Sequence, residues 1–493
     1  MRYLLNAKEM KQCDHNTIEA YHMPSEVLME RAALAVAAYI NEHQLTNFSF
    51  GILCGSGNNG GDGLAVARLL HQQGCDVTFM LTGNISHFTK ETSLQYQIAT
   101  DYQVPQTKEI ADILKADIII DAMLGIGISK DIQGALEEIV LAVNESHKPV
   151  IAIDIPSGIS ADNGQVMHVA VRCSATVTFA YEKIGHVLYP GCEYCGEVHI
   201  APIGITDDSL ADMKPTTLTY EPKDIQLLPK RTPDGNKGTF GKVLVIAGSK
   251  NMAGAAIFAA KAAYRMGCGM VKIVTPEANR AIIQTALPEA LLHTYESKLD
   301  EAALLETVQW ADVILAGPGM GTTTVAKQLV HFVLKNASVP VVLDADALNI
   351  LSKEMQLLLK PHTEMVVTPH VGEMSRMRNE NALLIKDHLI SVAEEFAREY
   401  NVVCVLKDAR CVTSIPYNKT YINPSGNHGM ATAGSGDVLS GIIAGLMAQG
   451  MSADDSAGLG VYIHGLAGDL ATKEKNAYSV MASDILDYLV QVL

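Results

Sequence analysis

The sequence is poor in aromatic residues and in charge. Aromatic residues make up 5% of the 493 positions, with one Trp, and Asp, Glu, Lys and Arg together reach 18%. Basic residues are the scarcer sign, since 37 Lys and Arg stand against 54 Asp and Glu, a formal net charge of −17. This balance excludes a broad surface for nucleic acid or anionic membranes, although a local basic pocket remains compatible with it.

Long hydrophobic runs and a dense cysteine framework are also missing. Charged residues interrupt the most apolar stretches, at Glu30 and Arg31 and again at Lys261 and Arg265, before about 18 uncharged residues accumulate. We therefore predict no transmembrane helix, and residues 1–14 lack the apolar segment of a secretory signal. The nine cysteines are scattered along the chain. A reducing cytoplasm is the expected location.

Short β-branched runs alternate with Ala-rich helical stretches along the chain. Strands are predicted at Phe50–Cys54, Asp117–Asp121, Val150–Ile155, Val243–Ala247, Val313–Ala316, Val341–Asp344 and Val402–Lys407. Continuous apolar strands separated by helices indicate parallel sheets covered on both faces, so the predicted fold class is α/β. The alternation breaks between Gly204 and Gly241, where prolines and charges are frequent. This predicts one domain at residues 1–220 and another at residues 221–493.

A glycine-rich segment, GSGNNGGDG at Gly55–Gly63, follows the first of these strands and precedes the helical run LAVARLLHQQ. Backbone N–H groups at a helix start can face a phosphate, and glycines allow its close approach. The alternative is a tight turn without a ligand. Asn58, Asn59 and Asp62 favour a ligand-binding loop, because clustered amides and carboxylates serve a hydrophobic core poorly.

Two further strand ends carry polar residues. Asp121 ends the strand before the loop DAMLGIGISKDIQG, and Asp154 and Ser157 follow the next strand in IDIPSG. Ligands gather at the carboxyl ends of parallel strands, so we expect these side chains to converge with Asn59. Their oxygens suit a hard cation, and two carboxylates allow one to hold it while Asp154 exchanges protons. The alternative is that each Asp caps the next helix.

These motifs carry a family resemblance over residues 1–215. NNGGDG, DAMLGIG and DIPSG, with PSEVLMERAA and TVTFAYEKIGHVLYPG, resemble the NAD(P)H-hydrate epimerase domain, the N-terminal half of bifunctional NAD(P)H-hydrate repair enzymes. The resemblance implies a Rossmann-like three-layer α/β/α domain with Asp154 as the catalytic group. It implies a potassium site at Asn59, Asp121 and Ser157. It also implies that the hydrated dinucleotide is bound by Asp154 and two loops, Asn58, Asn59, Gly60, Gly61 and Asp62, and Gly125, Ile126, Gly127, Ile128, Ser129, Lys130 and Asp131.

The densest motif of the second half is NPSGNHGMATAGSGDVLSGIIAGLMAQG at Asn423–Gly450. Its small residues lead into a helix, whose first backbone donors would form an anion hole beside Asp437. A carboxylate is unfavourable there unless it transfers protons next to a phosphate. The alternative is a turn in which Asp437 caps the helix.

Three other motifs fall at strand-to-helix junctions, namely GPGMG (Gly317–Gly321), LDADALN (Leu343–Asn349) and TPHVGEM (Thr368–Met374). His370 is interpreted as a ligand contact, with a satisfied structural histidine as the alternative. Asp344 and Asp346 could hold magnesium through water, or Asp346 could cap the helix that follows it.

From Leu227 to Leu493 this order of motifs resembles the ADP- or ATP-dependent NAD(P)H-hydrate dehydratase, a ribokinase-like fold. The resemblance implies that Asp437 is catalytic and deprotonates the substrate hydroxyl for attack on the terminal phosphate, whose loss restores the dihydropyridine. Implied substrate contacts are Ala253, Gly319, His370 and Asp437. Implied nucleotide contacts are Lys407, Asp408, Ala409, Arg410, Cys411 and Gly436.

Two segments depart from the family pattern. Val371 stands where the family usually has Pro, and Asp408 and Cys411 stand near a usual glycine and threonine. An extra carboxylate at Asp408 would repel nucleotide phosphates if it faced them, and Arg410 would compensate.

The sequence thus predicts a cytoplasmic repair enzyme that epimerises the R and S forms of hydrated NADH and NADPH and dehydrates the S form. Expected cofactors are K⁺ for the epimerase domain and Mg²⁺ with ADP or ATP for the dehydratase domain. Its partners would be these small molecules, with no nucleic acid and no membrane, and a homo-oligomer is expected. The alternatives are a ribokinase-like small-molecule kinase with an accessory N-terminal domain, or a non-catalytic N-terminal binding or assembly module.

Overall fold

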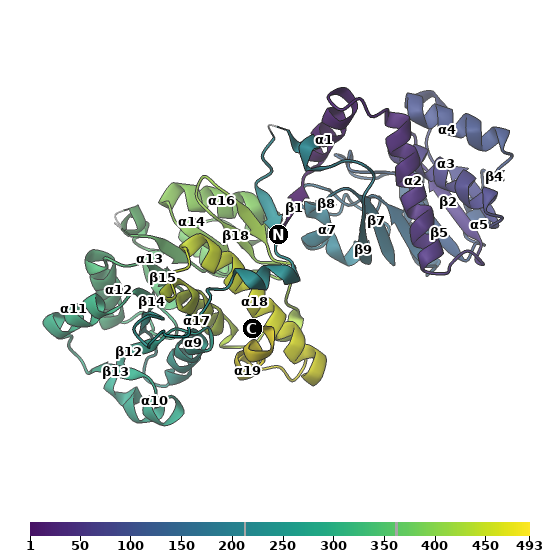
Figure 1. The fold of residues 1–493 in the computed structure, drawn as a ribbon. Coiled ribbons are helices and arrows are strands. Elements are labelled where there is room, and N and C mark those ends of the chain that lie inside the picture. The colour runs from purple at the N-terminus through teal and green to yellow at the C-terminus, as the bar shows by residue number, and fades with distance from the viewer. Residues whose placement is uncertain (212, 360–362) are drawn as a thin grey trace. The chain divides into compact units, whose positions relative to one another are not determined.

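A computed structural model describes residues 1–211, 213–359 and 363–493 (Figure 1). The chain forms two compact units, one at Tyr3–Thr217 and the other at Leu218–Leu493 together with Met1–Arg2. Each unit is built on a largely parallel sheet with helices between the strands. The predicted α/β fold class is therefore confirmed.

The unit at Tyr3–Thr217 has a seven-stranded parallel sheet in the order β4-β3-β2-β5-β6-β7-β9. In that order the strands are Gln106–Thr107, Val77–Leu81, Phe50–Cys54, Ile118–Ala122, Val150–Ile153, Ala175–Phe179 and Glu197–Ala201. Strand β2 pairs with β3 on one side and β5 on the other, so the strand order reverses between β2 and β5. A reversal of this kind opens a crevice at the carboxyl ends of the strands.

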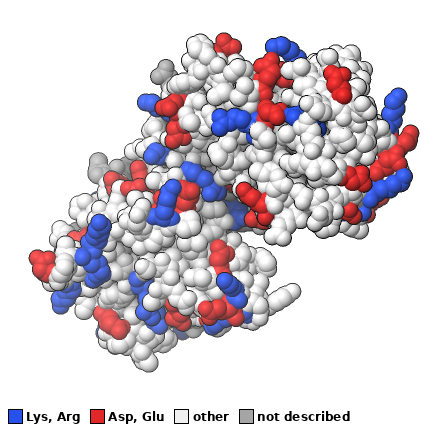
Figure 2. Space-filling view, turned by 45° about the vertical axis from the view of Figure 1, so that its right-hand side comes forward, with Lys and Arg blue, Asp and Glu red and all other residues white. Residues whose placement is uncertain are grey.

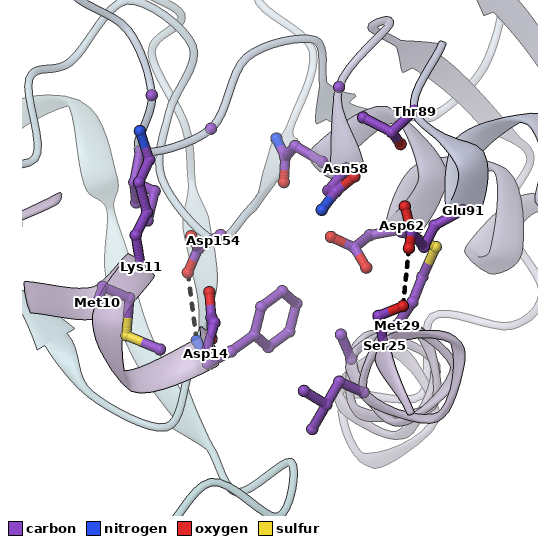
Figure 3. Close-up of a pocket in the computed structure, with 18 of the residues that line it drawn as sticks. Met10, Lys11, Asp14, Ser25, Met29, Asn58, Asp62, Thr89, Glu91 and Asp154 are labelled. Carbon is purple, nitrogen blue, oxygen red and sulfur yellow. Dashed lines mark hydrogen bonds between the residues drawn. The ribbon is translucent and has the colours of Figure 1, made fainter. Parts of the chain in front are cut away.

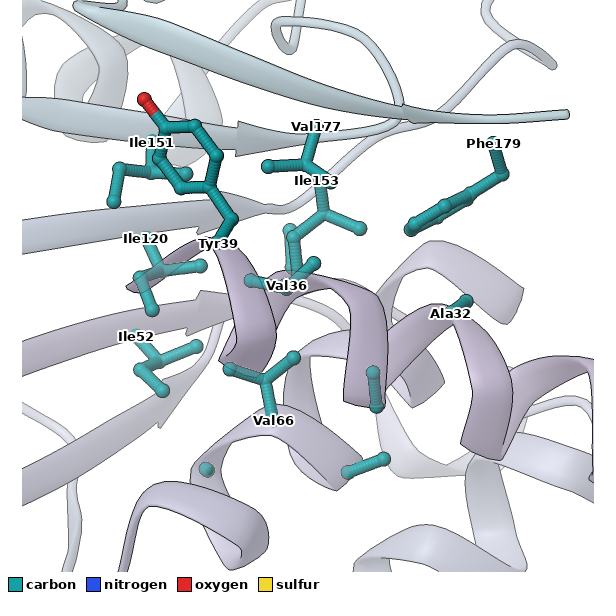
Figure 4. Packing of buried hydrophobic residues seen from close by; sticks show 14 of the residues in the cluster. Ala32, Val36, Tyr39, Ile52, Val66, Ile120, Ile151, Ile153, Val177 and Phe179 are labelled. Atoms are coloured by element: carbon teal, nitrogen blue, oxygen red, sulfur yellow. The ribbon is translucent and has the colours of Figure 1, made fainter. Parts of the chain in front are cut away.

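Helices cover both faces of this sheet. They are α1 (Ala7–Glu19), α2 (Ser25–Glu42), α3 (Asn58–Gln72), α4 (Lys90–Asp101), α5 (Ile110–Ile113) and α6 (Ala135–Glu145). On one face Val36 of α2 and Val66 of α3 pack among Ile52, Ile120 and Ile153 (Figure 4). On the other face the buried residues of α5 and α6 pack on the alternate side chains of β2 and β5. The apolar stretch of α2 thus largely serves the core of its own unit.

The second unit has a sheet in the order β13-β12-β11-β14-β15-β16-β17-β18-β19. These strands are Leu291–Tyr295, Met270–Pro276, Lys242–Ile246, Val313–Ala316, Val341–Leu343, Met365–Val367, Val403–Leu406, Val412–Ser414 and Thr420–Ile422. The pairs from β13 to β17 are parallel, whereas β17, β18 and β19 pair in antiparallel fashion. The order reverses between β11 and β14, which gives this unit a crevice of its own.

Helices α9 (Ala253–Arg265), α17 (Ser435–Ala448) and α18 (Ala453–Lys475) bury one face of this sheet. The others are α10 (Arg280–Ala286), α11 (Glu301–Trp310), α12 (Thr324–Asn336), α13 (Asp346–Leu351), α14 (Val371–Arg378), α15 (Ala382–Asp387), α16 (Leu389–Tyr400) and α19 (Ala482–Val492). Glycine allows α17 to approach α9 closely, because a Cβ at Gly441 would lie 2.2 Å from the carbonyl oxygen of Ala259. The small-residue pattern of these helices therefore serves packing.

The distribution of charged side chains and the hydropathy of the helices both agree with the composition of the sequence. Among the described residues on the face drawn in Figure 2, Lys and Arg side chains are interspersed with Asp and Glu. Within the described ranges, no helix combines the length and the hydropathy needed to span a bilayer.

Candidate active sites

A cavity of about 660 Å³ opens at the carboxyl ends of β2, β5 and β6 in the N-terminal unit (Figure 3). Polar groups from several elements line it, namely Lys11, Asp14, Ser25, Ser56, Asn58, Asn59, Asp62, Thr89, Glu91, Asp154 and Lys183. Met10, Met29 and Phe179 contribute apolar walls. A concave space with apolar walls and convergent polar groups is the usual form of a small-molecule site.

The predicted first loop is a helix start. Helix α3 begins at Asn58, with Gly57 as its N-cap, so the residues from Asn58 to Asp62 lie in its first turns. Asn58, Asn59 and Asp62 line the cavity. Gly60 and Gly61 are buried in packing contacts instead, since a Cβ at Gly60 would lie 2.0 Å from the carbonyl oxygen of Gly55. The glycines thus bring the helix N-terminus close to β2.

The second predicted loop follows β5 and meets the cavity along part of its length. Gly125, Ile126, Gly127 and Ile128 line the cavity. Ser129 lines an adjoining open depression of about 470 Å³, which also receives Lys8, Lys11 and Gln12 of α1. Lys130 and Asp131 are exposed and line neither space.

Asp154 occupies the floor of the cavity in an ion pair that the sequence did not reveal. Its Oδ1 accepts hydrogen bonds from Nζ of Lys183, a fully buried lysine, and from Oγ1 of Thr178 at 3.0 Å. Burial raises the pKa of the Asp154 carboxyl, but the charge and hydrogen bond of Lys183 outweigh it and hold the pKa below its usual value. Asp154 also has a positive φ of 67°, a conformation that non-glycine residues adopt uncommonly.

The pKa values of two other carboxyls in the cavity are raised, in contrast to that of Asp154. Burial, followed by repulsion from Asp154, raises the pKa of Asp14 to about 7. The same causes raise the pKa of Asp62 well above its ordinary value. The site therefore holds one ionised carboxylate beside two carboxyls that retain protons more strongly.

Asn59, Asp121 and Ser157 meet beneath the cavity around Leu124. Ser157 Oγ donates to Asp121 Oδ1 at 2.6 Å and accepts from the Leu124 N–H at 2.8 Å. Asn59 Nδ2 donates to the Leu124 carbonyl at 3.0 Å. Asp121 is fully buried and accepts the Met123 and Ser157 N–H groups, so it is not a helix cap. The cluster fixes the loop after β5 on β2 and β6.

The second unit gathers its polar groups at the carboxyl ends of β15, β16 and β17. Lys407 Nζ lies 2.8 Å from Oδ1 of the buried Asp344, which also accepts from Thr368 Oγ1 at 2.7 Å. Burial lowers the pKa of Lys407, but Asp344 outweighs it and raises the pKa above its usual value. Lys407 therefore stays charged at the mouth of this site.

Asp437 lies in the first turn of α17, where Gly434 is the N-cap and has a φ of 94°. The carboxyl does not cap the helix. Burial, followed by repulsion from Asp344, raises its pKa to about 7. A Cβ at Gly436 would lie 3.4 Å from Lys407 Nζ, so the helix start and the lysine adjoin each other.

His370 is both a helix cap and an exposed ring. Its Nδ1 accepts the N–H groups of Gly372 at 2.9 Å and Glu373 at 3.3 Å, in a capping box at the start of α14. The ring is half exposed, and burial together with Lys407 lowers its pKa. Since Nδ1 accepts, the neutral ring carries its proton on Nε2. Val371 is the first residue of α14, where a missing Pro leaves the helix intact.

The remaining residues from the sequence fall around this site. Asp346 begins α13 without capping it, and its Oδ2 accepts the Gly321 N–H at 2.8 Å. Ala253 begins α9 and is buried. A Cβ at Gly319, which has a φ of 58°, would lie 2.7 Å from Cβ of Ala255, so the loop after β14 packs directly on α9.

The segment from Asp408 to Cys411, which departs from the family pattern, makes contacts with other parts of its own unit. Asp408 Oδ1 lies 3.6 Å from Nζ of Lys386 on α15. Arg410 Nη1 donates to the Pro424 carbonyl at 2.6 Å. Cys411 packs partly buried against the core, and Ala409 is exposed. Lys386 thus provides a positive charge near the extra carboxylate.

Sequence reasoning missed Lys183 and Asp14. Glu182 and Lys183 follow β7 within an otherwise apolar segment, and charged residues in such a segment are the signal that was available. Asp14 lies in a helix among residues that read as surface, so its place in a cavity wall depends on tertiary packing.

Comparisons with known proteins agree with this geometry. A family model described as YjeF-related protein N-terminus matches residues 25–185, and one described as NAD(P)H-hydrate dehydratase matches residues 243–491. A ribokinase-like superfamily protein from Enterococcus faecalis is 28% identical with a TM-score of 0.51, over 56% of this chain and 95% of that chain.

Full-length relatives cover both units. The bifunctional NAD(P)H-hydrate repair enzyme of Moorella thermoacetica is 38% identical over 100% of this chain and 96% of its own length. The enzyme of that name from Thermofilum pendens is 33% identical over 98% of this chain and 95% of its own length. The chain belongs to the family of bifunctional NAD(P)H-hydrate repair enzymes.

Proposed function

We propose that the N-terminal unit interconverts the R and S epimers of hydrated NADH and NADPH, and that the C-terminal unit dehydrates the S epimer with ADP or ATP. The observation that carries this proposal is the 38% identical bifunctional relative, which aligns over the whole chain. We assign the first activity to residues 1–220 and the second to residues 221–493. A cytoplasmic location and a homo-oligomeric state remain predictions from the sequence.

The substrate chemistry sets what the first site must do. A dihydropyridine double bond is an enamine, so its hydration places the hydroxyl group on the carbon next to the ring nitrogen. Inverting this carbon requires one of its bonds to a heteroatom to break and to form again. A proton must move at each stage, which calls for general acid–base catalysis.

Asp154 is suited to accept the proton of that hydroxyl group. Its carboxylate faces the cavity, while Lys183 and Thr178 hold one of its oxygens from behind. The ion pair keeps Asp154 ionised at neutral pH, as a general base requires. The backbone of Gly125–Ile128 and the N-terminus of α3 would hold the dinucleotide phosphates.

The cluster beneath the cavity fits a potassium ion. Asn59 Oδ1 is buried without a hydrogen-bond partner, and Asp121 is a fully buried carboxylate nearby in the same network. Amide, hydroxyl and carbonyl oxygens suit a hard cation, and buried charges are normally paired or metal-bound. Asn59, Asp121 and Ser157 would hold the ion. Its charge would compensate Asp121 and stabilise the loop that contacts the substrate.

Asp437 is suited to activate the hydroxyl group in the second site. Its carboxyl takes the hydroxyl proton, and the oxygen then attacks the terminal phosphorus of the nucleotide. Loss of the resulting phosphate ester as inorganic phosphate, with loss of a proton from the neighbouring carbon, restores the ring double bond. Lys407 and the first N–H groups of α17 face the charge that develops on the phosphate. The half-exposed ring of His370, whose Nε2 lies 3.4 Å from Oε1 of Glu373, would contact the substrate.

The same site fits a magnesium ion bound with the nucleotide. Repulsion from Asp344 and Asp346 contributes to the raised pKa of Asp437, and Lys407 is the cation that pairs with Asp344. This local excess of negative charge favours a divalent cation. Asp344 and Asp346 would hold it through water, and it would screen the nucleotide phosphates.

The test mixes the protein with both epimers of hydrated NADH, Mg²⁺ and K⁺, with ADP or ATP in separate cuvettes, and follows the dihydronicotinamide absorbance. Complete recovery with one nucleotide is expected. Rapid recovery of one epimer, with the other at its spontaneous rate, would reduce the N-terminal unit to a binding module. Stable phosphorylation of a small molecule, without recovery of absorbance, would instead favour the kinase alternative.

A further inference from the structure

We propose that Asp14 is a second proton-transfer residue of the epimerase site, which donates a proton to the ring nitrogen of the hydrated dinucleotide while Asp154 accepts one from its hydroxyl group. The inference rests on the proposed epimerase function and adds a catalytic residue to it.

The position of Asp14 follows from the face that α1 turns to the cavity. Met10, Asp14 and Ile18 are spaced by four residues, and all three line the cavity. The adjoining side of the helix is buried, where Thr17 Oγ1 donates to Ser209 Oγ at 2.8 Å. Asn6 caps the helix in a capping box with Glu9. The helix is therefore held at both its start and its buried face.

The Asp14 carboxyl lies beside Asp154 in Figure 3, which shows both pointing into the space that the substrate would occupy. The charges of Asp154 and Lys183 both influence the pKa of the Asp14 carboxyl, the first raising it and the second lowering it. Asp62 of α3 faces it across the cavity, and Lys11 lines the same wall from α1. Asp207, in the short helix Asp207–Leu210 packed against α1, accepts a hydrogen bond from Tyr181 at 2.7 Å.

The two neighbouring carboxyls differ in protonation. Burial and Asp154 raise the pKa of Asp14 to about 7, while Lys183 holds that of Asp154 below its usual value. At neutral pH one group can therefore give a proton and the other can take one. Carboxyls whose environments separate their pKa values in this way commonly divide the roles of acid and base.

Asp14 and Asp154 together can catalyse the epimerisation with no net gain or loss of protons. Asp154 removes the hydroxyl proton, the oxygen forms a carbonyl group, and the carbon–nitrogen bond breaks with its electron pair passing to nitrogen. Asp14 protonates that nitrogen. The freed aldehyde rotates about its single bond to the adjacent carbon and presents its other face. Closure reverses each step, so both protons return to the groups that supplied them.

The experiment measures epimerisation in the full-length protein without adenine nucleotide, starting from one purified epimer and separating the two by chromatography. The variants are Asp14→Asn, which keeps the shape and removes the proton, and Asp14→Glu, which keeps the acid. Glu19→Gln is the matched control, because Glu19 is an exposed carboxylate at the end of the same helix.

We expect Asp14→Asn to lower the epimerisation kcat by about 10²–10⁴-fold with KM little changed. In the unmodified protein the rate should fall as pH rises through about 7, because Asp14 then loses its proton. This decline should persist in Asp14→Glu and disappear in Asp14→Asn. Glu19→Gln should behave as the unmodified protein.

An Asp14→Asn rate within threefold of the unmodified protein would overturn the inference, as would an unchanged decline above pH 7 in the residual activity. Circular dichroism and the thermal midpoint of each variant exclude loss through unfolding. If Asp14→Asn unfolds, the pH dependence of Asp14→Glu is measured instead. An epimerisation rate of Asp14→Glu that no longer falls above pH 7 would also overturn the inference. If the unmodified protein shows no epimerisation above the spontaneous rate, the proposed function itself fails.

Discussion

The ammonium group of Lys407 lies 2.8 Å from Oδ1 of Asp344, and the Asp344 side chain is 1% exposed. This pair joins the carboxyl ends of β17 and β15 on either side of β16, and Thr368 at the end of β16 completes it through a hydrogen bond to Asp344. The polar cluster at the carboxyl ends of these strands therefore contains a buried ion pair.

Lys407→Met should destabilise the C-terminal unit, because it leaves Asp344 buried without its counter-charge. Loss of one partner of a buried pair costs about 3–5 kcal/mol. Denaturant unfolding that separates the transitions of the two units measures the effect. Lys386→Met is the control, since Lys386 makes a more exposed contact with Asp408, and a change of equal size there would contradict the prediction.

Asp437→Asn should abolish nucleotide-dependent dehydration and leave epimerisation unchanged. In the unmodified protein the dehydration kcat/KM should fall as pH drops below about 7, because the raised pKa of Asp437 leaves the base protonated there. The rate profile between pH 5 and 9 measures this. A profile that is flat across pH 7 would exclude Asp437 as the base.

Lys183→Met should move the acid limit of epimerisation to higher pH. Without Lys183, only the smaller effects of His186 and Thr178 oppose burial, so the pKa of Asp154 rises and the base is protonated over a wider pH range. Asp154→Ala should lower turnover by about 10²–10⁴-fold while cation and dinucleotide binding persist. Isothermal titration checks the binding, and loss of binding together with turnover would contradict a proton-transfer role for Asp154.

Asn59→Ala should weaken the response of epimerisation to potassium. Asn59 Oδ1 is a buried acceptor without a partner, and its removal takes away one proposed ligand of the ion. We expect the potassium concentration for half-maximal rate to rise at least about tenfold, the effect of about 1.4 kcal/mol. Titration of K⁺ against a lithium background measures it. Equal potassium dependence in both proteins would remove Asn59 from the site.

Gly441→Ala should destabilise the packing of α17 on α9. The new Cβ would lie 2.2 Å from the Ala259 carbonyl oxygen, so the helices must separate, at a cost of about 1–3 kcal/mol or more. At Gly254 in α9 a Cβ meets nothing within 4 Å, so Gly254→Ala should be neutral or stabilising by about 0.5 kcal/mol. Differential scanning calorimetry compares the two variants.

Local patterns were enough to predict seven of the strands, which are β2, β5, β6, β11, β14, β15 and β17. Phe50–Cys54 and Val313–Ala316 are strands with the predicted bounds, because a short apolar run that ends directly before a glycine is typical of a buried strand. The start of α3 was placed too late, since Asn58–Asp62 reads as a glycine-rich turn. Contacts of its glycines with Gly55 and Met29 stabilise the helix there, and these contacts lie outside the local pattern.

The sequence by itself determined the α/β class, the motif order and the candidate carboxylates Asp154 and Asp437, since each depends on residues adjacent along the chain. Only the tertiary structure decided the partners of those carboxylates. It brought Lys183 to Asp154, Asp14 into the same cavity and Lys407 to Asp344. Protonation depends on burial and on charges a few ångströms away, and these are set by the packing of segments that are distant in sequence.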